Sequence, residues 1–195
     1  MNSLEWCGAI LAVIYLVLAE KRLKSCWIPY VGSSAVYLVV FWNASLPVNA
    51  FLQLFFVAMG VRGYLSWSKS DKPVVPLRCP PKLLLTCAVG VVAGTLVLTG
   101  LLGRSGTPIG SALGDSFLTA ASLATTVLTE RRYLESWVAW IVIDLLAVAF
   151  FFVQGLPLTS VLYLLYVVLA FRCFREWQRV LGHHKSDVLH AGSPV

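Results

Sequence analysis

Charged residues are scarce in this sequence of 195 residues. They make up 12% of the chain, whereas 58% of the residues are hydrophobic; soluble globular domains have about 25% charged residues. A water-soluble fold is therefore excluded, and the composition indicates an integral membrane protein. No charge at all occurs from Ser25 to Val61, a stretch too long for one membrane-spanning helix.

Motifs of common catalytic sites are also missing. The sequence has no H-E-x-x-H metal site, nucleophile elbow or phosphate-binding glycine loop, so we expect neither an enzyme nor a cofactor. The cysteines lack metal-ligand spacing, which predicts reduced thiols and no metal site; they are Cys7, Cys26, Cys79, Cys87 and Cys173. Basic residues follow the first apolar run instead of preceding it, and this order predicts a retained helix, not a cleaved signal peptide.

The apolar runs that are present predict an all-α integral membrane protein with seven transmembrane helices. The helices are expected at residues 4–21, 27–43, 47–67, 83–103, 113–130, 136–153 and 157–177. Short turns at 43–47 and 154–157 must separate two of the helix pairs, because Pro47 and Pro157 favour the starts of helices. Residues 68–82 are expected to form a cytoplasmic loop and residues 178–195 a cytoplasmic tail, which we expect to be disordered from Gly182.

Residues 17–67 repeat at residues 127–177 with a constant offset of 110 and no gap. The matched positions include charges, prolines and tryptophans: Glu20 with Glu130, Arg22 with Arg132, Trp27 with Trp137, Pro47 with Pro157, and Trp67 with Trp177. Two three-helix repeats, 4–67 and 113–177, are therefore expected on either side of a linker helix, 83–103. Four membrane crossings between equivalent helices make the repeats parallel, which is the 3+1+3, SWEET-like arrangement of membrane transporters.

The basic residues predict the orientation of the chain in the membrane. All 15 Lys and Arg residues except Arg104 fall on one side of the predicted bundle. The positive-inside rule places this side in the cytoplasm, with the N-terminus outside and the C-terminus inside the plasma (inner) membrane. The net charge of +6 is then a topology signal, and we expect the lipid bilayer and no nucleic acid as a partner.

Three residues of the helix predicted at 136–153 share one helix face. Trp137, Trp140 and Asp144 are spaced i, i+3 and i+7. Asp144 lies about 12 Å into that helix and is the one acid far from both membrane faces, where an ionisable group is costly and usually functional. Aromatic faces and a carboxylate together suit a flat cation, so these residues predict a substrate pocket.

The first repeat supplies Trp27, Tyr30 and Ser34 at the matching positions, which predicts a second aromatic stripe across the path. Gln53 and Tyr163 also match each other, six residues beyond their turn prolines, and we expect both to contribute to binding.

Each of these residues also has a structural interpretation. Asp144 is also compatible with a packing bond to a neighbouring helix, although acids inside the membrane are usually functional, and Gln53 is compatible with an interhelical amide contact. Trp137 lies near the membrane boundary, where tryptophan commonly anchors a helix, and we assign Trp67 and Trp177 to the same aromatic belt.

Acidic residues mark the ends of the helices predicted at 4–21 and 113–130. Glu5 and Asp115 lie near the outer ends, and Glu20 and Glu130 near the inner ends. The charge-free stretch between each pair spans about 21 Å of a roughly 30 Å hydrocarbon core. These acids are therefore either gate contacts between the repeats or ordinary charges at helix ends.

The chain resembles the PnuC family of bacterial vitamin transporters from residue 4 to residue 177. The segments that carry the resemblance are FLQLFF at 51–56, GYLSW at 63–67 and ESWVAWIVID at 135–144. The resemblance implies a seven-helix, SWEET-like homo-oligomer, often a trimer, that takes up nicotinamide riboside by facilitated diffusion. A cytoplasmic kinase then traps the vitamin.

By position, the resemblance assigns substrate binding to Trp137, Trp140, Gln53 and Tyr163. Asp144 departs from the family motif, which has asparagine there in nicotinamide riboside carriers. A carboxylate suits a cation, so we expect nicotinamide riboside first, thiamine second and riboflavin third. A membrane partner subunit that transports nothing is the alternative from another class, but it has no need of matched aromatic stripes.

Overall fold

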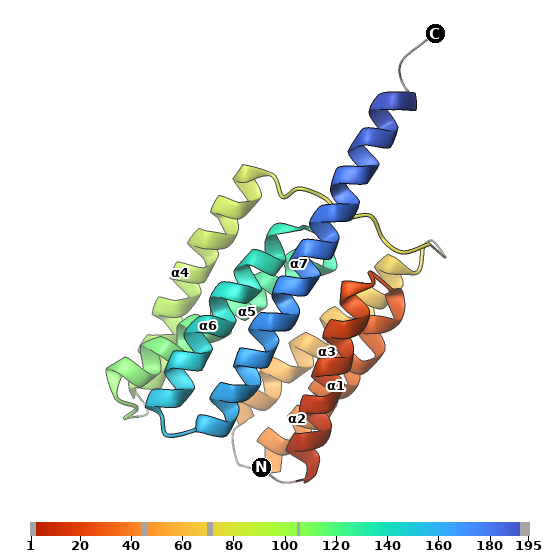
Figure 1. Cartoon of the computed structure of the whole chain (residues 1–195). Helices are drawn as coiled ribbons and strands as arrows, with labels where there is room; N and C mark the ends of the chain where they lie inside the picture. Colours follow the sequence, from red (N-terminus) through yellow and green to blue (C-terminus); the bar gives the residue numbers. More distant parts are fainter. Residues whose placement is uncertain (1–2, 44–46, 70–71, 105, 192–195) are drawn as a thin grey trace.

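The computed structural model describes residues 3–43, 47–69, 72–104 and 106–191 (Figure 1). This described part folds into seven α-helices and one short 3-10 helix. Their bounds are α1 Ser3–Glu20, η1 Lys24–Cys26, α2 Trp27–Asn43, α3 Pro47–Trp67, α4 Pro81–Arg104, α5 Ile109–Glu130, α6 Glu135–Val153 and α7 Pro157–Ala191. The all-α fold with seven helices is confirmed, and each predicted start is correct to about one turn.

α7 is the one helix whose end was predicted wrongly. It continues to Ala191 and projects beyond the bundle (Figure 1), so the expectation of disorder from Gly182 is wrong up to Ala191. The segment has no proline to stop the helix, and Glu176 pairs with Arg179 at 2.8 Å one turn further on, which supports continuation.

The two predicted turns have different outcomes. Residues 44–46, between α2 and α3, lie outside the described residues. The turn between α6 and α7 is present, and it is closed by Gly155, whose φ of +75° is readily adopted by glycine. Its N–H donates to the Phe152 carbonyl at 3.1 Å.

Five of the helices are long and apolar enough to cross a membrane, among the residues that the structure describes: α1, α2 with its preceding turn, α4, α6 and α7. α5 falls short of that hydropathy. α5 packs against α3, α4 and α6 and buries Ser116, Thr125, Thr126 and Thr129. Because protein surrounds it on several sides, α5 carries small polar residues that a lipid-facing helix would avoid.

The helices pack in an order that follows the repeat. α1 packs on α2 and α2 on α3, as α5 packs on α6 and α6 on α7, while α4 packs on α5 (Figure 1). The two sets meet where α1 contacts α7 and where α5 contacts α3. The first helix of each set therefore packs against the third helix of the other.

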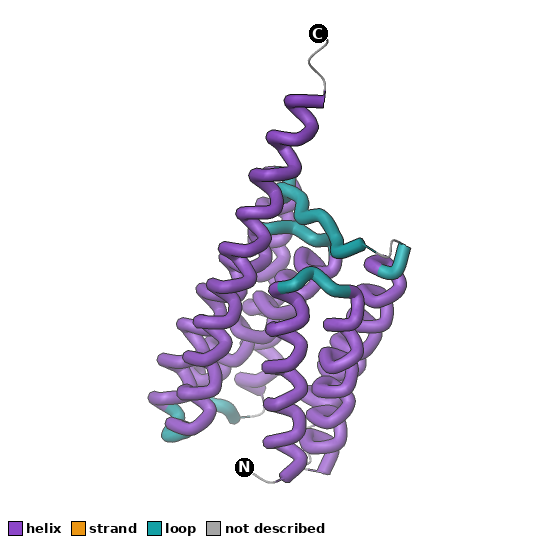
Figure 2. Tube along the Cα trace, turned by 45° about the vertical axis from the view of Figure 1, so that its right-hand side comes forward, coloured by secondary structure: helices purple, strands orange, loops and turns teal. Residues whose placement is uncertain are grey.

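The two helix-ending turns that precede η1 and α6 are equivalent in the repeat and have the same geometry. Arg22 and Arg132, 110 residues apart, both have positive φ, at 60° and 67°. The loop that leads from α3 to α4 crosses both turns (Figure 2). Val74 N–H donates to the Arg22 carbonyl at 3.2 Å, and Leu77 N–H donates to the Arg132 carbonyl at 2.9 Å. We call the end of the bundle that carries these turns and this loop the basic end.

Candidate functional site

Four tryptophans form a buried cluster near the basic end. Trp27, Trp67, Trp137 and Trp177 are each at most 2% exposed. Ring centroids lie 5.3 Å apart for Trp27–Trp67 and 5.4 Å apart for Trp137–Trp177, both edge to face. Trp67 and Trp177 join the pairs at 5.9 Å. We call these four residues the tryptophan tetrad. It joins α2 to α3 in the first repeat, α6 to α7 in the second repeat, and α3 to α7 between the repeats.

The assignment of Trp67 and Trp177 to an interfacial belt is wrong. Trp67 Nε1 donates to the Glu130 carbonyl and Trp177 Nε1 to the Ala19 carbonyl, both at 2.9 Å. Trp67 of α3 contacts the end of α5, and Trp177 of α7 contacts the end of α1. Both side chains are therefore inside the protein and do not face lipid. Trp137, the other tryptophan weighed as an anchor, is fully buried too.

The remaining two indole N–H groups of the tetrad have no partner. Trp27 Nε1 and Trp137 Nε1 are buried without a hydrogen bond in the described part of the chain, at equivalent positions of the two repeats. A buried donor without an acceptor is costly, and both repeats carry this cost at the same position.

Two ion pairs cross between the repeats beside the tetrad. Arg62 of α3 faces Glu130 of α5 at 3.6 Å, and Arg172 of α7 pairs with Glu20 of α1 at 3.0 Å. The two arginines are equivalent in the repeat, and so are the two glutamates. Of the two interpretations of Glu20 and Glu130, the structure supports contacts between the repeats.

We call the α6 face with Trp137, Trp140 and Asp144 the α6 stripe; it starts in the tetrad at Trp137, and its other two residues lie one and two turns further along the helix. Trp140 is half-buried, and its Nε1 donates to Thr129 Oγ1 of α5 at 3.0 Å. Thr129 Oγ1 in turn donates to the Thr125 carbonyl at 2.9 Å. This chain of bonds fixes the orientation of the Trp140 ring, a role of Thr129 that sequence patterns did not reveal.

Asp144 is 5% exposed, and the structure gives it no hydrogen bond or ion pair to any other residue within the described ranges. The alternative in which it bonds to a neighbouring helix for packing is therefore not what the structure shows. A buried carboxylate without a protein partner is unfavourable and is the strongest local indication of a bound cation or hydrogen-bond donor.

Tyr163 of α7 is half-buried and stacks on Phe151 with ring centroids 5.1 Å apart. It lies within electrostatic range of Asp144 and Asp115, so three of the predicted residues gather in this region. Gln53 of α3 is half-buried, and none of the described contacts joins it to these residues.

In the first repeat, Tyr30 packs between Tyr15, at 4.9 Å, and Trp27, at 5.3 Å. Ser34 is buried one turn further along α2. Tyr15 of α1, buried beside these rings, was not expected in the stripe. At the far end of α1, Glu5 is half-buried, and Asp115 of α5 is exposed.

The α3–α4 loop is held by Glu135, the first residue of α6. Cys79 N–H donates to Glu135 Oε2 at 2.8 Å, and Arg78 pairs with Glu135 Oε1 at 3.2 Å. Burial, followed by the negative charge of Glu135, raises the pKa of the Cys79 thiol, so the thiol is protonated at neutral pH. Burial lowers the pKa of Arg22 at the other turn that the loop crosses.

Two cavities open on the surface away from the α6 stripe. One, of about 430 Å³, lies between α3 and Glu130 of α5; the other, of about 440 Å³, lies among α4, α5 and α6. Neither is lined by the predicted binding residues. No group of three or more His, Cys, Asp and Glu side chains gathers at metal-binding distance among the described residues.

Seven helices, five of them long and apolar enough among the described residues to cross a membrane, are typical of a multi-pass membrane protein. A family profile described as "Nicotinamide mononucleotide transporter" matches residues 2–179. The chain belongs to this transporter family.

Curated relatives cover most of the chain. It is 23% identical to the nicotinamide riboside transporter PnuC of Escherichia coli (strain K12) and to that of Shigella flexneri, over 91% of this chain and 85% of each relative. It is 25% identical to the riboflavin/roseoflavin transporter RibM of Streptomyces davaonensis, over 89% of this chain and 83% of RibM. A crystal structure of the vitamin B3 transporter PnuC has the same fold, with a TM-score of 0.73, 23% identity and coverage of 93% of this chain and 83% of that one.

Proposed function

We propose that this protein carries nicotinamide riboside across the plasma (inner) membrane by facilitated diffusion. Family membership and two relatives named for that substrate support the proposal. The observation that carries it is Asp144, buried and without a protein partner on the α6 face that also presents Trp140. A pyridinium ring that stacks on the indole and pairs with the carboxylate would satisfy both groups.

The charge of the proposed site favours nicotinamide riboside over nicotinamide mononucleotide, the compound in the family description. Nicotinamide mononucleotide carries a phosphate, whereas the proposed binding residues include one acid and no cation: Gln53, Trp137, Trp140, Asp144 and Tyr163. A phosphate near Asp144 would be repelled, so the uncharged ribose of the riboside is the better match.

Riboflavin is the second candidate, because RibM is among the relatives. Its neutral ring would stack on Trp140 but gain nothing from the charge of Asp144. Thiamine, a cation, remains the alternative on charge alone.

The proposed mechanism is rocking of one three-helix repeat against the other in a 3+1+3, SWEET-like arrangement, with α4 as the linker. The basic end would face the cytoplasm and the N-terminus the outside. Three features join the repeats at the basic end: the tetrad, the Arg62–Glu130 and Arg172–Glu20 pairs, and the α3–α4 loop. In this proposal they keep the carrier closed toward the cytoplasm. Release into the cell would then require these contacts to separate.

In this proposal, no ion or ATP drives transport and the protein catalyses no reaction; a cytoplasmic kinase traps the vitamin. The carrier is proposed to assemble as a homo-oligomer, with a trimer as the first expectation. A membrane subunit that only binds a companion protein is the competing class, and it would leave the unpartnered Asp144 without a role.

The test is titration of the purified protein with nicotinamide riboside, thiamine and riboflavin in separate runs, followed by intrinsic tryptophan fluorescence corrected for inner-filter absorption. Saturable quenching by nicotinamide riboside at lower concentration than by the other two is expected. A tighter response to riboflavin would transfer the assignment to that vitamin. No response to any of the three, from folded protein, would refute the proposed substrate class.

A further inference from the structure

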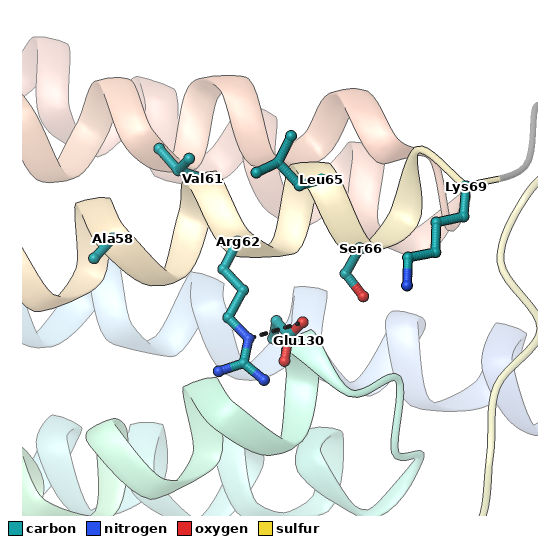
Figure 3. A pocket seen from close by; sticks show the side chains of 7 residues that line it. All are labelled: Ala58, Val61, Arg62, Leu65, Ser66, Lys69 and Glu130. Atoms are coloured by element: carbon teal, nitrogen blue, oxygen red, sulfur yellow. Dashed lines mark ion pairs between the residues drawn. The ribbon is translucent and has the colours of Figure 1, made fainter.

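The cavity of about 430 Å³ at the basic end has a polar wall that the proposed transport path does not use. Arg62 and Ser66 of α3 and Lys69 of the turn that follows it are spaced by four and three residues, and their side chains lie on the side of Glu130 (Figure 3). Val61 and Leu65, exposed to 48% and 63%, flank this row on the same helix. The cavity thus combines cations, a hydroxyl and an apolar margin.

The positive charge in the cavity is only partly neutralised. Arg62 is 61% exposed and faces Glu130 at 3.6 Å, a distance longer than a good hydrogen bond. Lys69 makes no ion pair with any residue in the described ranges. The cavity therefore contains two cations, Arg62 and Lys69, and one carboxylate, that of Glu130.

The equivalent place in the second repeat differs at one decisive position. Glu176 stands where Ser66 stands in the first repeat, and it binds Arg179, the equivalent of Lys69, through two hydrogen bonds of 2.8 and 2.9 Å. Arg172 also bonds its glutamate more closely than Arg62 does, at 3.0 Å. Arg172 and Arg179 thus each have a closely bonded glutamate, whereas Lys69 has no ion pair among the described residues.

We propose that this cavity binds the phosphate of an anionic phospholipid, such as phosphatidylglycerol. The phosphate oxygens would accept hydrogen bonds from Lys69, Ser66 and the free N–H groups of Arg62. An acyl chain would follow Val61 and Leu65 along the outer face of α3. Basic pockets between membrane helices near the headgroup level commonly recognise such lipids, and the apolar margin favours a lipid over a free anion.

The experiment is native mass spectrometry of the full-length protein in detergent, titrated with phosphatidylglycerol and, separately, with phosphatidylcholine. Phosphatidylglycerol is expected to bind preferentially. Lys69→Gln should weaken its binding about fivefold, the factor expected for one cation beside a lipid phosphate. Ser66→Glu, which copies the arrangement of the second repeat, should remove the preference. Arg179→Gln is the matched control and should leave the affinity unchanged.

Several results would overturn the proposal. Equal binding of the two lipids, or an equal effect of Lys69→Gln and Arg179→Gln, would mean that the cavity does not recognise the headgroup. Displacement of the lipid by millimolar inorganic phosphate would identify a free-anion site. If a second copy of the protein covers the cavity instead, native mass spectra without added lipid would show an oligomer that Lys69→Gln dissociates. Melting temperatures of the variants separate these results from misfolding, and failure of lipid recognition leaves the vitamin titrations unaffected.

Discussion

Trp140→Ala is the substitution that tests the proposed vitamin site most directly. The indole is half-buried and held by its hydrogen bond of 3.0 Å to Thr129 Oγ1, so a substrate that stacks on it meets a ring already in place. An aromatic contact contributes about 0.5–1.5 kcal/mol, and a cation over its face adds about 0.5–2 kcal/mol. Loss of the ring should therefore cost about 2 kcal/mol, which weakens the affinity for nicotinamide riboside about 30-fold.

Trp140→Phe tests the aromatic ring and the Trp140–Thr129 hydrogen bond separately. It keeps an aromatic face but loses the hydrogen bond to Thr129 that orients the ring, so the loss of affinity should be smaller than for Trp140→Ala, and the free energy of unfolding should fall by about 1 kcal/mol. Thr129→Val should have a similar effect, and the double variant should cost less than the sum because both changes remove the same bond.

Isothermal titration calorimetry of the purified variants measures these losses. Trp42→Ala is the control, since Trp42 is 63% exposed near the end of α2 and should leave affinity unchanged. Wild-type affinity in a folded Trp140→Ala protein, with a normal melting temperature, would refute the placement of the site on α6.

Three further predictions follow from other contacts. Asp144→Asn retains hydrogen-bonding capacity, so nicotinamide riboside binding should persist within about tenfold; complete loss of uptake into vesicles would show that the carboxylate has another task. Arg172→Glu should lower the melting temperature, because it sets like charges against Glu20, and Glu20→Arg in the same chain should restore it; failure of this rescue would contradict the ion pair. Gly63→Leu should destabilise the protein by about 1–3 kcal/mol, since a side chain there meets the Trp27 ring; an unchanged melting temperature would disprove this close packing.

Much of the fold could be predicted because membrane helices follow local rules. Apolar runs bounded by charge and proline predicted the starts of all seven helices to about one turn. The constant offset of 110 residues also predicted that matched positions have the same backbone geometry, and Arg22 and Arg132 both have positive φ angles. The exception was the end of α7, where a polar segment without packing signals continues as a helix to Ala191.

Partners of individual side chains were harder to predict. Tryptophan beside basic residues at a helix end has the same local pattern whether it faces lipid or another helix, and for Trp67 and Trp177 the pattern favoured the wrong choice. The bond from Trp140 to Thr129 joins two helices, and no spacing within one helix reports such a contact.

The sequence by itself determined the membrane class, the helices, the internal repeat and a buried acid on an aromatic helix face, because hydropathy, charge and periodicity are properties of each segment. Only the tertiary structure decided that the repeats are joined by crossed ion pairs and a tryptophan tetrad, and that Asp144 has no partner among the described residues. These facts depend on which helices become neighbours and how closely they approach, and that is set by packing of the whole bundle.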